Sequence, residues 1–174
     1  MYARAFRGTR RDTSPIRRKI LPLSDVTGKV RAYAEGGKTS VKDDQMPAKR
    51  VLIVDDIPDV RSELALLLSL SGDITVAGEA SDGREAVLLA EALQPEVILM
   101  DLEMLPMDGY EAARQIRLRL PDCRVIALTI HDCEEVRAKC LEAGMEGFLV
   151  KGARLETLLQ AIRRPVGDQK GETK

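Results

Sequence analysis

The sequence is poor in the residues that build several common kinds of site. It has no tryptophan, aromatic residues amount to 3%, and its three cysteines show no CxxC spacing. His131 is the only histidine, so the ligands of a zinc site are lacking and a reducing compartment, the cytoplasm, is expected. A metal site must then use oxygen ligands, which favours magnesium, manganese or calcium. No apolar run approaches the roughly 20 residues that cross a bilayer, so no membrane span is expected.

Charge is divided unevenly along the chain. The residues up to Arg50 include 13 basic and 5 acidic side chains, whereas the remainder includes 14 basic and 23 acidic ones. Residues 1–49 show no apolar periodicity and are predicted to form a basic, disordered extension. Residues 50–165 are predicted to form one domain, followed by a polar tail at 166–174. Because this domain is acidic and poor in aromatics, any nucleic-acid binding would fall to the basic extension.

From Arg50 onward, short apolar runs alternate with amphipathic stretches of helical length. The run Val51-Leu52-Ile53-Val54 is typical of a strand buried on both faces, as parallel strands covered by helices are. Strands are predicted at 50–55, 74–79, 96–101, 123–129 and 146–150. Helices are predicted at 58–70, 83–93, 109–119, 133–142 and 154–163. Right-handed crossovers then give a doubly wound α/β sheet, in which ligands bind beyond the carboxyl ends of the strands.

Reactive side chains stand where these strands end. They are Asp55 and Asp56 after the first strand, Asp101 at the end of the third, Thr129 at the end of the fourth, and Lys151 after the fifth. One aspartate there would be ordinary, because aspartate also caps helices. Three carboxylates at one edge repel one another and require a cation, which indicates a site for Mg²⁺ or Mn²⁺. Together with Lys151 and Thr129, such a site suits phosphoryl transfer to Asp101 as the nucleophile.

The order of these residues resembles the response-regulator receiver family of two-component signalling. The resemblance covers residues from about 50 to 165 and extends to the segments around the site. These segments are Met100-Asp101-Leu102-Glu103-Met104, Met107-Asp108-Gly109, Ala127-Leu128-Thr129, and Ala143-Gly144 ahead of Gly147-Phe148-Leu149-Val150-Lys151. The resemblance implies a flavodoxin-like (βα)5 fold with five parallel strands in the order 2-1-3-4-5.

The resemblance also implies the roles of the acidic residues. Asp101 would accept a phosphoryl group from a sensor histidine kinase or a phosphotransfer protein. Asp56, Asp101 and the backbone carbonyl of Glu103 would bind Mg²⁺ directly, and Asp55 would act largely through a coordinated water. The side chains of Glu103 and His131 occupy positions that set the lifetime of the phosphoryl group in receivers.

The route by which the signal leaves the site is implied in the same way. Thr129 and Lys151 would sense the phosphoryl group, and Phe148 would be the aromatic that changes rotamer on activation. The added charge would pull Thr129 and its loop inward. The face formed by the last two helices and the last strand, within residues 133–163, would then serve a homodimer or an output partner.

The chain departs from the family pattern at two prolines. Leu105 stands four residues after Asp101, where receivers usually have proline, and Pro106 follows it. We therefore expect the loop after the third strand to run differently. Gly152 follows Lys151 where many receivers have a proline in a cis peptide, and a cis bond before glycine would cost about 2.5–4 kcal/mol. The NarL/LuxR-like subfamily often lacks that proline, so this departure is typical of the subfamily.

Several functions remain open at this point. The stretch from Gly147 to Arg164 resembles receivers that precede a helix-turn-helix DNA-binding domain, but only ten residues follow it. We expect either a stand-alone receiver with a partner, or a transcriptional regulator of the same family that lost its output domain. A haloacid-dehalogenase-type phosphatase is a remote alternative, because Glu103 replaces the second aspartate it needs. The chain is thus expected to be no enzyme beyond catalysing its own phosphoryl transfer and slow dephosphorylation.

Overall fold

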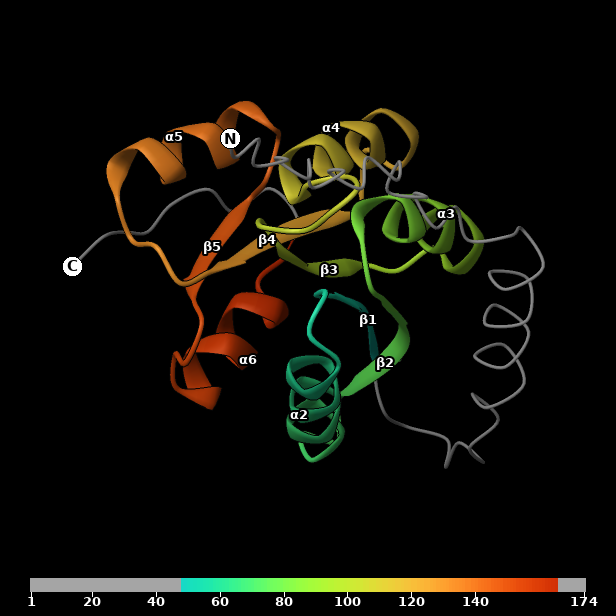
Figure 1. Ribbon diagram of the computed structural model, residues 1–174. Coiled ribbons are helices and arrows are strands. Elements are labelled where there is room, and N and C mark those ends of the chain that lie inside the picture. The colour runs from blue at the N-terminus through green and yellow to red at the C-terminus, as the bar shows by residue number, and fades with distance from the viewer. Residues whose placement is uncertain (1–47, 166–174) are drawn as a thin grey trace, which may run out of the picture.

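A five-stranded parallel sheet forms the centre of the molecule (Figure 1). The computed structural model describes residues 48–165. The strands are β1 (Lys49–Val54), β2 (Ile74–Ala80), β3 (Val97–Asp101), β4 (Arg124–Thr129) and β5 (Gly147–Val150). Their order in the sheet is β2-β1-β3-β4-β5, and every neighbouring pair is parallel. The predicted flavodoxin-like (βα)5 fold is therefore confirmed.

Helices cover both faces of the sheet. They are α2 (Pro58–Ser69), α3 (Gly83–Leu93), α4 (Gly109–Arg119), α5 (Glu134–Glu142) and α6 (Leu155–Arg163). Figure 1 shows α2 and α6 on one face and α3, α4 and α5 on the other. The loops that follow the strands all lie at one edge of the sheet, because every strand runs in the same direction.

The core has two halves, one on each face of the sheet. Leu52 and Val54 belong to the half under α3, α4 and α5, whereas Val51 and Ile53 belong to the half under α2 and α6. All four side chains are fully buried. Successive residues of a strand point to opposite faces, so a strand covered on both sides needs a continuous apolar run. This requirement explains why the central strands show no polar alternation.

The observed element boundaries lie within one residue of the predicted ones. Pro58 occupies the first turn of α2, and the Asp82 carboxylate caps α3 by accepting hydrogen bonds from two backbone N–H groups. The one difference that bears on chemistry is at the end of β1, which stops at Val54 instead of Asp55. Asp55 turns the chain there, because its Oδ1 accepts a hydrogen bond from the backbone N–H of Ile57 at 2.9 Å.

Two predictions concern parts of the chain outside the described residues. The basic extension at 1–49 lies almost entirely outside them, and the polar tail at 166–174 lies wholly outside. Both stay predictions. Between residues 48 and 165, none of the helices has the length and apolar character to span a membrane.

A buried arginine fastens the end of α6 to the sheet. Arg124 is 4% exposed, and its guanidinium donates hydrogen bonds to backbone carbonyls at the end of α6. The acceptors are Ala161, Ile162 and Arg164, at 2.7–3.4 Å. Glu146, before β5, lies 3.6 Å from Arg124 and also pairs with Arg117 of α4 at 2.7 Å. A cation at a helix C-terminus satisfies carbonyls that have no partner within the helix.

We predict that Arg124→Met lowers the free energy of unfolding by about 2–4 kcal/mol, because charge-assisted hydrogen bonds inside the protein are lost. Urea unfolding followed by circular dichroism measures this change. Arg119→Met is the matched control, since Arg119 makes an exposed ion pair with Glu91 and should cost less than about 1 kcal/mol. Equal losses in the two variants would contradict the structural role of Arg124.

Candidate phosphorylation site

Three carboxylates meet at the carboxyl edge of the sheet. Asp101 is the last residue of β3, and Asp55 and Asp56 follow β1, which pairs with β3 in parallel. Asp55 is fully buried and Asp101 is 5% exposed, whereas Asp56 is exposed. One carboxylate oxygen from each residue lies within 4.8 Å of the others. The structure therefore brings together the three acidic residues that were predicted to meet.

Lys151 places a positive charge among these carboxylates. Its Nζ lies 2.8 Å from Asp55 Oδ2 and 3.1 Å from Asp101 Oδ1. The backbone N–H of Lys151 donates a hydrogen bond to the carbonyl of Thr129 at 2.7 Å, which ties the residue to β4. Gly152 follows with a positive φ of 88°, a conformation that suits glycine. Lys151 thus reaches both buried carboxylates although no proline follows it.

The loop after β3 contains the one cis peptide among residues 48–165. This bond joins Leu105 to Pro106, so the proline lies one residue later than in the usual family pattern. Leu105 itself is largely exposed, whereas Met104 beside it is buried in the core. Leu105 thus leaves an apolar side chain on the surface of the loop after β3.

Burial and charge oppose each other within the cluster. Burial raises the pKa of Asp101 above its ordinary value; contact with Lys151 opposes the shift, and the Asp55 charge adds to it. Burial lowers the pKa of Lys151, but its contacts with Asp55 and Asp101 outweigh this effect and hold the pKa above its usual range. One ammonium therefore does not fully compensate the carboxylates around it.

The donor set fits a hard cation. Asp55 Oδ2 is buried, and its contact in the described residues is the Lys151 ammonium at 2.8 Å. An anionic oxygen of this kind, close to two further carboxylates, is suited to Mg²⁺ or another oxygen-binding ion.

Thr129 and the loop after β4 lie beside the carboxylates. Thr129 is the last residue of β4, 2% exposed, and follows Leu128, which pairs with Asp101 across the sheet. Its Oγ1 accepts a hydrogen bond from the backbone N–H of His131 at 3.1 Å. The His131 ring in turn lies 3.2 Å from a carboxylate oxygen of Glu103, and both side chains are more than half exposed. These two residues therefore bridge the loops after β3 and β4 at the surface.

Close backbone packing sets the position of Asp101. A Cβ on Gly109, the first residue of α4, would lie 2.1 Å from the carbonyl oxygen of Asp101. The backbone N–H of Gly109 donates to the carbonyl of Leu102 at 3.1 Å. Only glycine allows α4 to begin this close to the end of β3. The segment Met107-Asp108-Gly109 signals this requirement in the sequence.

Two arginines near the site are not identified by the sequence patterns. Arg61 of α2 donates from Nη1 to the carbonyl of Asp55 at 2.7 Å and pairs with Glu79 at 3.5 Å. Arg137 of α5 lies over the ring of Phe148, with the guanidinium carbon 4.6 Å from the ring centroid. Both are long side chains on helices, and sequence spacing gives no signal of where such side chains reach.

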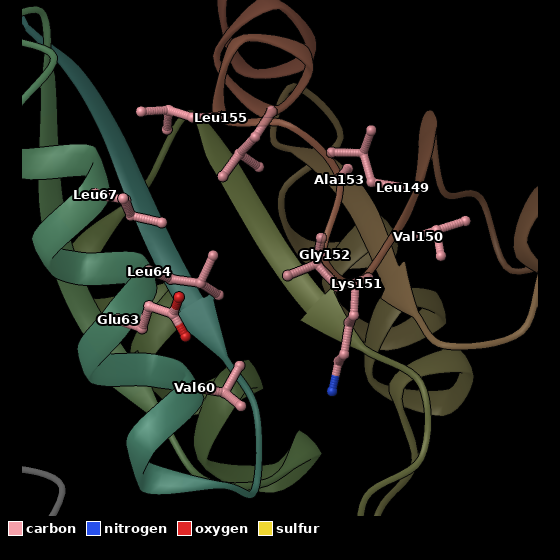
Figure 2. A pocket seen from close by; sticks show the side chains of 12 residues that line it. Val60, Glu63, Leu64, Leu67, Leu149, Val150, Lys151, Gly152, Ala153 and Leu155 are labelled. Atoms are coloured by element: carbon pink, nitrogen blue, oxygen red, sulfur yellow. The ribbon is translucent and has the colours of Figure 1, made fainter.

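An apolar groove of about 220 Å³ lies beside Lys151. Figure 2 shows Val60, Leu64 and Leu67 of α2 facing the segment from Leu149 to Leu155. Lys151 and Glu63 also line the groove. The groove therefore places an apolar surface beside the carboxyl edge of the sheet.

Comparison with known proteins places the chain and its fold in a family. The family model described as the response regulator receiver domain matches residues 51–163. LiaR, a transcriptional regulatory protein of Bacillus subtilis, is 45% identical over 125 residues, 72% of this chain and 58% of that protein. The chain spans about half the length of the curated relatives it matches.

Solved structures give the same result. The signal receiver domain of a response regulator NarL from Mycobacterium tuberculosis aligns with a TM-score of 0.63 at 35% identity, covering 68% of this chain and 98% of that one. CheY of Borrelia burgdorferi, solved in a complex with CheX, BeF3 and Mg²⁺, aligns with a TM-score of 0.63 at 27% identity, covering 67% and 87%. The chain belongs to the response-regulator receiver family of two-component signalling, among its NarL/LuxR-like members.

Proposed function

We propose that the chain is a phosphorylation switch in which Asp101 accepts a phosphoryl group from a sensor histidine kinase or a phosphotransfer protein. The observation that carries this proposal is the pairing of a buried, strand-end Asp101 with Lys151 Nζ at 3.1 Å, beside Asp55 and Asp56. We take residues 50–165 as the functional unit. It acts in the cytoplasm as a signalling module, and its catalysis is limited to its own phosphoryl transfer and slow dephosphorylation.

The carboxylates of Asp55, Asp56 and Asp101 and the backbone carbonyl of Glu103 would hold Mg²⁺ or Mn²⁺. A bound ion supplies positive charge for the oxygens of the incoming phosphoryl group. The Mg²⁺ in the Borrelia CheY complex supports this assignment by similarity.

The chain's own residues account for the transfer step. An oxygen of Asp101 attacks phosphorus in line, the bond from phosphorus to the donor histidine breaks, and its electron pair stays on nitrogen. Lys151 neutralises negative charge on one phosphoryl oxygen, and the Thr129 hydroxyl donates a hydrogen bond to another. Lys151 and Thr129 remain in contact with the acyl phosphate on Asp101 after transfer, and so they sense that it is present.

Phosphorylation would change the face formed by α5, β5 and α6. Phosphate adds roughly one to two negative charges, which attract Thr129 and the loop after β4. Phe148 on β5 then changes rotamer, and the altered face recruits a second copy of the chain or an output partner. His131 and Glu103 lie 3.2 Å apart at the surface between the loops after β3 and β4. We expect this pair to control the access of water and so the lifetime of the phosphoryl group.

The groove beside Lys151 is the surface on which the phosphodonor would rest. The groove adjoins the edge of the sheet that carries Asp101. Its lining is largely apolar and comes from α2 on one side, between Val60 and Leu67, and from the segment between Leu149 and Leu155 on the other. An apolar helix face of the donor would fill it and bring the phosphohistidine to the site.

Incubation with Mg²⁺ and acetyl phosphate should add one phosphoryl group to the wild type and none to Asp101→Asn. Intact-mass spectrometry measures the adduct, and omission of Mg²⁺ should remove it. Asp122→Asn, an exposed aspartate away from the site, is the control and should be phosphorylated normally. An adduct of equal yield in Asp101→Asn would contradict the assignment of the phosphoacceptor.

Without metal, Asp101→Asn should be more stable than the wild type at pH 7.5. Because the pKa of Asp101 is raised in the folded protein, its ionised form destabilises the fold above that pKa. The difference should shrink as the pH falls through the folded pKa towards about 4, the value of the unfolded chain. Thermal unfolding from pH 4 to 8 tests the trend, and Mg²⁺ should stabilise the wild type more than the variant. A less stable variant at pH 7.5 would rule out that the buried charge of Asp101 destabilises the fold.

A Val60→Lys substitution should slow phosphoryl transfer from a protein donor without slowing transfer from acetyl phosphate, because only the protein donor contacts the groove. A phosphorylated histidine phosphotransfer protein serves as the donor, and transfer is followed by radiolabel. Leu66→Lys is the control, since Leu66 lies on the same helix, is 63% exposed and does not line the groove. The docking proposal fails if both variants accept phosphate from the protein donor at the wild-type rate.

A further inference from the structure

Arg137 joins two elements of the face that would carry the signal, α5 and β5, to the loop after β4. It belongs to α5, and its Nε and Nη2 donate to Asp132 Oδ1 at 2.9 and 2.5 Å. Asp132 lies in the loop between β4 and α5. The guanidinium also lies over the ring of Phe148 on β5, 4.6 Å from the ring centroid. One side chain thus contacts a loop, a helix and a strand.

These contacts form a continuous path from the phosphorylation edge to Phe148. The path begins at Thr129, whose Oγ1 accepts a hydrogen bond from the backbone N–H of His131. Asp132 is the next residue along the loop, and Arg137 holds its carboxylate while lying over Phe148. A displacement of Thr129 would therefore move a carboxylate to which Arg137 is bound.

Helix stability does not account for Arg137. It lies near the N-terminus of α5, where the helix dipole disfavours a cation and where Glu134 and Glu135 are already placed favourably. Its side chain is 44% exposed and contributes little to the core. The contacts that distinguish it are the lateral ones with Asp132 and Phe148.

We propose that Arg137 is a positioning residue that couples the loop after β4 to Phe148. This inference rests on the proposed function, because it concerns how phosphorylation of Asp101 reaches the face of α5, β5 and α6. Arg137 favours one relative position of the loop and the ring and so sharpens the difference between the two states of the switch.

The expected size of the coupling follows from the two contacts. An exposed ion pair and an exposed cation–π contact are each worth less than about tenfold in a population ratio, and together about tenfold. Suppose that the ring of Phe148 divides between two positions at about 10:1 in one state of the switch and about 1:10 in the other. If loss of the contacts lowers the first ratio to about 1:1, the change in population between the two states falls to about half. This loss occurs whichever of the two states the contacts favour.

Fluorine NMR of Phe148 tests the inference. The chain has two phenylalanines, so Phe6→Leu leaves Phe148 as the single site for 4-fluorophenylalanine. Addition of Mg²⁺ and acetyl phosphate should shift the signal, with the adduct on Asp101 measured by intact mass in the same sample. Arg137→Met keeps an unbranched side chain and removes the cation, and should reduce the shift to about half at an unchanged adduct level.

Two further variants complete the experiment. Asp132→Asn removes the ion pair but leaves the cation over the ring, so it should give an intermediate shift. Arg114→Met is the matched control, because Arg114 is a similarly exposed arginine of α4 paired with Glu111, and it should leave the shift unchanged. A full shift in Arg137→Met at a normal adduct level would overturn the coupling role. Absence of any adduct in the wild type would instead overturn the proposed function on which the inference rests.

Discussion

The contact of Lys151 with Asp55 and Asp101 is the interaction on which the site depends. Two carboxylates whose side chains are at most 7% exposed share one ammonium, so their charges are neither well solvated nor fully paired. A buried charge without full compensation costs several kcal/mol unless further positive charge arrives or a proton is taken up. The resting site is therefore built to gain from a cation. The site also holds the Lys151 ammonium close enough to Asp101 to pair with an anion added to that carboxylate.

The parallel sheet is what gathers these groups. Asp55 follows β1 and Asp101 ends β3, two adjacent central strands whose apolar side chains are buried on both faces, so packing on both sides holds their backbones. Gly109 packs a helix start against the carbonyl of Asp101, and Arg61 holds the carbonyl of Asp55. The acidic residues thus stand on the rigid part of the fold, where repulsion between them cannot be relieved by separation.

Strand-end residues were predictable, whereas lateral side-chain contacts were not. The apolar runs reveal the strands, and parallel strands must bring Asp101 and Lys151 to one edge, so the core of the site follows from order along the chain. The ends of long side chains follow no such rule. Arg124 reaches the last turn of α6, and Arg137 reaches Phe148, through several rotatable bonds whose angles depend on tertiary packing. The contacts of the Lys151 side chain with Asp55 and Asp101 likewise depend on tertiary packing and could not be predicted in detail.

The two sides of the site differ in how firmly they are held, and this difference would give the proposed switch a direction. β3 lies between two neighbours and all its residues are buried, whereas β5 is an edge strand of four residues, three of them partly exposed. Elements that must move are drawn from the less stable parts of a fold. Lys151 follows β5 directly, and Phe148 lies within it. A charge added to Asp101 would therefore move the β5 side, while the β1 and β3 side stays in place.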